Sequence, residues 1–336
     1  MDCDQAHATS RRTMLRAGAA AGAAAALSAA GVMAAGTASA SIASASTGGS
    51  LPYPDITDTS HASPRAAEIF RGFFSAKSRH DPDKLMTYFS RTNAYYIDAS
   101  SGNVWPDWQS LSDVFHAFLP SAPPDALSYP LRIVGDEHSA LVEFEDTPQL
   151  FGKELRILGS VTFDHHGKII RWIDYWDGRS SVRPTSIGPT YPTDFRDGEV
   201  NASRLVQHAA QQLQAAFAAG DSATAVSLMS FDAVFEDSAA HTRVRGQLQV
   251  QRYLSRALGQ TPYGPGAAVA HVEGSNRGGG YEWTAAPVAA PMRRGHTGIE
   301  LDESGKISRV TVMYNSGLLS YSAYQALVGL AAEAPL

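Results

Sequence analysis

A long internal repeat constrains this chain of 336 residues more than any other feature of its sequence. An offset of 139 carries Asp98 onto Asp237 and matches four apolar positions within 111–119 with residues of similar character. An offset of 138 carries residues 167–171 onto 305–309, and both runs have the form Gly-Lys-Ile-x-Arg. Such self-similarity predicts two copies of one structural unit, which differ by a one-residue deletion.

The first 40 residues are predicted to be an export signal. The pair Arg11-Arg12 precedes an alanine-rich apolar stretch, and the stretch ends in the small residues Ala38-Ser39-Ala40. This order is typical of a signal peptide, and the paired arginines resemble the twin-arginine export class. The alternative is an alanine helix flanked by arginines. We expect cleavage after Ala40 and a secreted protein with no membrane anchor in its mature form.

Composition narrows the possible partners and chemistry. Cys3, the single cysteine, lies in the predicted signal, so the mature chain has neither a disulfide nor a thiolate. The net charge of −6 argues against nucleic acid, which needs a concentrated basic surface. The adjacent His165-His166 precede Gly167 in a predicted turn, where solvent exposure is favoured over a metal site. We expect no metal and no cofactor.

Composition also indicates the domain boundaries. Residues 41–62 are rich in small and polar residues and predict a flexible linker, and residues 184–200 predict a second one. The segments 63–183 and 201–330 then form one domain each. Both are expected to contain three helices followed by a curved antiparallel sheet, an α+β unit, and the two repeats are expected to pack on each other.

Local signals support this order of elements in the first domain. Ser63-Pro64 predicts the start of a helix, with serine as the N-cap and proline at the first helical position. Strand-like runs then follow over 93–98, 140–146, 155–163 and 169–176. Helices followed by several neighbouring strands are typical of an α+β domain.

Two segments carry a resemblance to a known family. The strand Asn-Ala-Tyr-Tyr-Ile-Asp over 93–98 and the closing run 167–177 resemble the nuclear-transport-factor-2-like superfamily. Within it, the chain is most similar to SnoaL-like polyketide cyclases and limonene epoxide hydrolase. The resemblance covers nearly all of 63–180 and, more weakly, 201–330. It implies two tandem cone-shaped α+β barrels, a fold that carries both enzymes and binding modules.

Strand alternation predicts which side chains face the interior of the first domain. Asp174 shares a face of the last strand with two tryptophans, and Asp98 and Asp146 are expected to face the same cavity. The alternative for Asp146 is a turn cap before Thr147-Pro148. The residues expected to line or roof this cavity are Tyr96, Trp105, Phe144, Trp172 and Trp176.

Carboxylates in an apolar cavity predict acid–base chemistry. Desolvation raises the pKa of a carboxyl group, and a second carboxylate nearby raises it further, so one acid stays protonated beside an ionised neighbour. Such a pair could open an epoxide, close a ring or move a double bond in an apolar small molecule. The alternative is an exported protein that binds a small molecule or a partner without catalysis.

The resemblance assigns roles to individual residues. It implies that Asp174 activates water, that Asp146 is the acid and that Tyr96 helps to hold the water. Asp98 stands where the family has an asparagine. Phe144 stands where the family has an arginine, and no basic residue on that strand replaces it.

The second copy has lost most of these groups. Val312 replaces Asp174 and Ala285 replaces Asp146, whereas Asp237 remains. His296 is an alternative base, although a lone histidine in a strand is more often structural. The second copy is therefore expected to be degenerate, as a packing partner or a binding-only unit.

Overall fold

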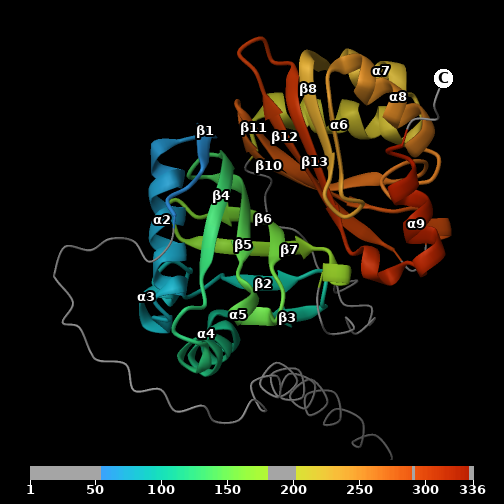
Figure 1. Cartoon of the computed structure of the whole chain (residues 1–336). Coiled ribbons are helices and arrows are strands. Elements are labelled where there is room, and N and C mark those ends of the chain that lie inside the picture. The colour runs from blue at the N-terminus through green and yellow to red at the C-terminus, as the bar shows by residue number, and fades with distance from the viewer. Residues whose placement is uncertain (1–53, 181–201, 290–291, 333–336) are drawn as a thin grey trace, which may run out of the picture.

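The computed structural model of the protein describes residues 54–180, 202–289 and 292–332 (Figure 1). The predicted signal over 1–40 and the predicted linker over 184–200 lie outside the described residues. The described chain forms two halves, each built from helices and one sheet. We call the part before the first gap the N-terminal half and the part after it the C-terminal half.

Helices cover one face of a seven-stranded sheet in the N-terminal half. The helices are α2 (Pro64–Ser78), α3 (Pro82–Met86), α4 (Trp108–Phe118) and α5 (Pro148–Phe151). The strands are β1 (Asp58–Ala62), β2 (Tyr95–Asp98), β3 (Asn103–Trp105), β4 (Ser128–Gly135), β5 (Ser139–Asp146), β6 (Leu155–Phe163) and β7 (Ile169–Trp176). Their order across the sheet is β1-β4-β5-β6-β7-β2-β3.

A six-stranded sheet forms the C-terminal half. The helices are α6 (Arg204–Ala218), α7 (Ser222–Ser227), α8 (Gln247–Ala257) and α9 (Tyr321–Gly329). The strands are β8 (Met229–Asp237), β9 (Thr242–Arg245), β10 (Ala268–Ser275), β11 (Gly278–Thr284), β12 (Arg294–Leu301) and β13 (Ile307–Tyr314). Their order is β10-β11-β12-β13-β8-β9.

The element order of the N-terminal half recurs in the C-terminal half, and strand register matches the repeat. Asp98 on β2 lies opposite Asp174 on β7, and Asp237 on β8 lies opposite Val312 on β13. Asp98 and Asp237 therefore occupy the same place in the two sheets, as the offset of 139 predicts.

The α+β class is confirmed, but several details differ from expectation, among them the short elements β3 and α5, which were not predicted. The sheets are mixed, because β1–β4, β2–β7 and β8–β13 pair in parallel. Only strands joined by tight hairpins must run antiparallel, and these pairs are far apart in sequence. Residues 58–62, expected in the linker, form β1, which pairs with the otherwise open edge of β4. Helix α9 was not predicted. The cone shape stays a prediction.

Helix α2 shows how local sequence places the core. Ser63 caps the helix by accepting the N–H of Ala66 at 3.1 Å, and Pro64 occupies the first turn. Phe70, Phe73 and other apolar residues then recur at helical spacing and are buried against the sheet. The same face of α2 also carries Lys77 into the interior.

The two sheets pack against each other through the faces that their helices leave uncovered. Figure 1 shows α2 on the side of its sheet away from the C-terminal half. Arg132 on β4 donates to Glu300 on β12 at 2.7 Å, and Arg171 on β7 pairs with Glu282 on β11. Met313 on β13 packs with apolar side chains of the N-terminal sheet. Both of these buried arginines therefore have a carboxylate partner in the other half.

Candidate functional site

Asp174, in the middle of β7, is the centre of the candidate site. It is 5% exposed and lies on the face that α2 covers. Its Oδ1 accepts the indole N–H of Trp172 at 2.5 Å, and its Oδ2 accepts the hydroxyl of Tyr96. Trp172 and Trp176 share this face while Tyr175 packs on the other, which confirms the predicted alternation of β7.

The aromatic side chains around Asp174 fill the interior. Trp172 is 1% exposed and stacks on Phe73 of α2 with ring centres 4.6 Å apart. Phe144 is also buried and packs edge-on against Trp172. Both were expected to line a cavity, and the structure places them in the packed core because α2 brings its phenylalanines into that space. A hollow of about 330 Å³ lies on α6 and α7 in the C-terminal half.

The partly exposed edge of the site lies at β2 and β3. Tyr96 on β2 pairs with Trp105 on β3, and their rings meet edge-on at 5.4 Å. Both side chains are partly exposed, as is Trp108 at the start of α4. The site is therefore closest to solvent beside Tyr96 and Trp105.

A buried cation accompanies the carboxylates. The Lys77 Nζ lies 2.9 Å from Oδ1 and 3.2 Å from Oδ2 of Asp146, and 5.0 Å from the ring centre of Phe144. As the sequence predicts, the strand of Phe144 carries no basic residue in place of the family arginine. Lys77 reaches this interior from α2 instead. A lysine among the apolar residues of that helix was the available signal.

Asp98 both caps a turn and faces the site. Its Oδ1 accepts the N–H of Ser100 at 3.1 Å and that of Ser101 at 2.9 Å. The same oxygen accepts the indole N–H of Trp176 at 2.9 Å. The carboxylate is thus fixed beside Asp174, its partner across β2 and β7.

Gly159 on β6 was not predicted as part of the site. A Cβ at this position would lie 3.1 Å from Asp174 Oδ1, 3.1 Å from Trp172 Nε1 and 3.0 Å from Val142. Glycine therefore leaves the space in which the carboxylate and the indole meet. Nothing in the local sequence marks it, because the close neighbours come from adjacent strands.

Burial is the main reason that the pKa of Asp174 rises from 3.8 to about 7. Hydrogen bonds from Tyr96 and Trp172 oppose the rise, as does the charge of Lys77, whereas the charge of Asp98 adds to it. Burial likewise raises the pKa of Asp98. Asp174 can therefore exchange a proton near neutral pH, as a general acid or base must.

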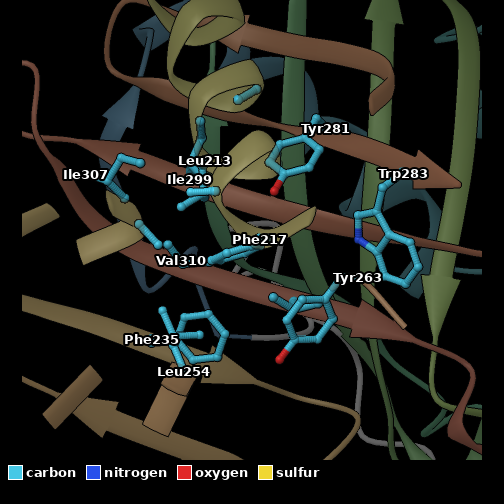
Figure 2. Close-up of a cluster of buried hydrophobic side chains, with 14 of the residues drawn as sticks. Leu213, Phe217, Phe235, Leu254, Tyr263, Tyr281, Trp283, Ile299, Ile307 and Val310 are labelled. Atoms are coloured by element: carbon cyan, nitrogen blue, oxygen red, sulfur yellow. The ribbon is translucent and has the colours of Figure 1, made fainter. Parts of the chain in front are cut away.

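The C-terminal half holds a different buried carboxylate. Asp237 accepts the hydroxyls of Tyr263 at 3.1 Å and Tyr314 at 3.2 Å, and burial raises its pKa to about 7. Figure 2 shows Tyr263 beside Trp283 in the apolar cluster of this half. Phe217 of α6 lies there too, at the place that Lys77 occupies on α2. This carboxylate thus has phenol partners, and no lysine of the described residues pairs with it.

His296 does not belong to this interior. It lies on the other face of the C-terminal sheet, where its Nε2 pairs with Glu273 and its ring lies 5.7 Å from that of Tyr175. Ser160 of the N-terminal half donates to the same Glu273 at 3.0 Å. His296 is therefore part of the interface between the sheets, and its candidacy as a base of the second copy is wrong.

The described residues contain no group of three His, Cys, Asp or Glu side chains placed to hold a metal ion. No described helix combines the length and the apolar character that crossing a membrane requires.

Comparison of the sequence with family models and with characterised proteins finds no match. Solved structures that match include a steroid delta-isomerase from Pseudomonas aeruginosa, at 21% identity and a TM-score of 0.31, over 40% of this chain and 93% of that one. The epoxide hydrolase/cyclase-like enzyme SalBIII matches at 17% identity and 0.29, over 34% and 91%. A SnoaL-like protein of unknown function from Burkholderia thailandensis matches at 12% identity and 0.29, over 34% and 94%.

Proposed function

We propose that the N-terminal half is a cofactor-independent acid–base enzyme that acts on an apolar small molecule. The reaction is an epoxide opening, a cyclisation or an isomerisation. One observation carries the proposal: Asp174, with a pKa of about 7, lies in an aromatic interior and contacts the hydroxyl of Tyr96. Groups that exchange protons near neutral pH inside apolar surroundings are typical of catalytic sites.

The neighbouring groups have distinct roles in this proposal. Asp174 takes a proton from the substrate or from the attacking water, and Tyr96 and Lys77 stabilise the negative charge that develops on a substrate oxygen. The protonated Asp174 then returns this proton to the product, which regenerates the carboxylate. The substrate enters beside Trp105, at the partly exposed edge, and displaces Tyr96 from Asp174. Asp146 pairs with Lys77 and fixes its position in the interior. The C-terminal half contributes no reacting group, and the protein is exported by the signal over residues 1–40.

A second candidate function is binding or interaction without catalysis. The packing of Trp172 on Phe73 favours it, because those rings occupy the space in which a substrate would have to sit. In that case the buried carboxylate of Asp174 is a structural group that takes no part in a reaction. The two candidates differ in turnover, which one experiment can measure.

The test compares Asp174→Asn with Asp237→Asn on a panel of apolar epoxides and β,γ-unsaturated ketones. Both changes keep the shape of the side chain and remove its basicity, and both carboxylates have a pKa of about 7. Asp174→Asn is expected to lower turnover by roughly 10²-fold or more. Asp237→Asn should leave turnover nearly unchanged. Wild-type activity in Asp174→Asn, equal losses in both variants, or no turnover by the wild type would reject catalysis in the N-terminal half.

A further inference from the structure

We infer that the C-terminal half completes the site of the N-terminal half, and that Asn315 is the residue that positions it. The inference rests on the proposed function only for its effect on turnover. In this inference, a side-chain amide of the C-terminal half holds together two segments of the N-terminal half. Both segments carry residues of the site.

Asn315 directly follows β13 and is 5% exposed. Its Nδ2 donates to the carbonyl of Ser100 at 2.9 Å, and its Oδ1 accepts the backbone N–H of Gly178 at 3.0 Å. Ser100 lies in the turn after β2, and Gly178 lies just beyond β7. One amide therefore bridges the ends of two neighbouring strands of the N-terminal sheet.

Ser100 connects Asn315 to the site through its own hydrogen bonds. Its hydroxyl donates to the carbonyl of Trp176 at 2.5 Å and accepts the N–H of Trp176 at 2.9 Å. Its own N–H donates to Asp98, and the indole of Trp176 donates to the same carboxylate. Asn315 is thus one hydrogen bond removed from the groups that fix Asp98 beside Asp174.

The contact requires glycine at position 178. A Cβ there would lie 2.3 Å from Asn315 Oδ1, so a larger residue would push the amide away. Adjacent contacts hold the same junction: Asp177 accepts the N–H of Ser316 at 2.8 Å, and Arg179 donates to the carbonyl of Ser316 at 2.7 Å. The end of β7 is therefore attached to the C-terminal half at several consecutive residues.

Through these contacts the C-terminal half influences the candidate site of the N-terminal half. The charge of Asp98 is one of the influences on the protonation of Asp174, and the position of Asp98 depends on the turn that Asn315 holds. Asn315 is a positioning residue, since it reaches Asp174 only through Ser100 and Asp98.

The test follows the indole N–H of Trp176 by NMR in the ¹⁵N-labelled full chain, with the resonance assigned by Trp176→Phe. Asn315→Ala removes both bridging bonds and should shift this resonance and speed its solvent exchange at least tenfold. Gly178→Ala keeps every donor but displaces the amide, so it should have the same effect. Glu300→Gln is the control, because it weakens an interface ion pair with Arg132 without touching this turn.

The expected pattern is a change in Asn315→Ala and Gly178→Ala with none in Glu300→Gln, together with a fall in kcat and little change in KM. An unchanged Trp176 resonance in Asn315→Ala would overturn the inference, as would an equal change in Glu300→Gln. The NMR readout does not depend on turnover. An inactive wild type would therefore reject the proposed function and leave the positioning role to be judged by the resonance alone.

Discussion

Lys77 and Asp146 form an ion pair inside the N-terminal half, with the lysine Nζ 2.9 Å from Asp146 Oδ1. The two side chains are 10% and 5% exposed, and they come from α2 and from the end of β5. An ion pair with so little solvent is expected to behave as one unit, because removal of either member leaves a buried charge without a partner.

The first prediction therefore concerns stability. Lys77→Met should lower the free energy of unfolding by about 3–5 kcal/mol, because it leaves the buried Asp146 carboxylate without a partner of opposite charge. The double variant with Asp146→Asn should recover most of this loss. Urea unfolding of the two single variants and the double variant measures the cycle. A double variant no more stable than Lys77→Met would contradict the pairing.

The second prediction concerns the close approach at Gly159. Gly159→Ala places a Cβ 3.1 Å from Asp174 Oδ1, so we expect a loss of about 1–3 kcal/mol in unfolding free energy and lower turnover. Gly329→Ala is the matched control, because it lies in α9 with open space around its Cβ. The control should be neutral or stabilising by up to about 1 kcal/mol. Equal effects of the two changes on thermal unfolding would argue against a tight site.

The third prediction follows from the raised pKa of Asp174. A carboxyl whose pKa is about 7 when folded and 3.8 when unfolded lowers stability as the pH rises from about 4 to about 7. Asp174→Asn removes this penalty, so the variant should gain about 2–3 kcal/mol relative to the wild type between pH 5 and pH 8. Unfolding curves at the two pH values measure the gain. A constant difference between variant and wild type would mean that Asp174 does not titrate in this range.

The fourth prediction concerns the pH profile of the proposed reaction. With Asp174 as the base, kcat/KM should rise with pH through a pKa of about 7. Burial of the carboxyl group is the largest cause of this raised pKa. Tyr96→Phe removes a hydrogen bond to the carboxylate and should move the rise to higher pH. Asp98→Asn removes a nearby negative charge and should move it to lower pH. Shifts of the same sign in both variants would be incompatible with Asp174 as the titrating group.

Much of the N-terminal half could be predicted from local sequence. Alternation placed Trp172, Asp174 and Trp176 on one face, because successive side chains of a strand point to opposite sides. The helix cap at Ser63 also depends on neighbouring residues alone. The repeat offset paired Asp98 with Asp237, and strand register agrees.

The remaining parts of the site depend on contacts between distant residues. Lys77 meets Asp146 across 69 positions, and the Gly178 N–H meets Asn315 across 137. Gly159 matters only because β5 and β7 lie on either side of β6. The sequence by itself determined which face of each strand is apolar, since that follows from backbone geometry. Only the tertiary structure decided which charges and amides meet at the site, since packing brings them together from separate elements.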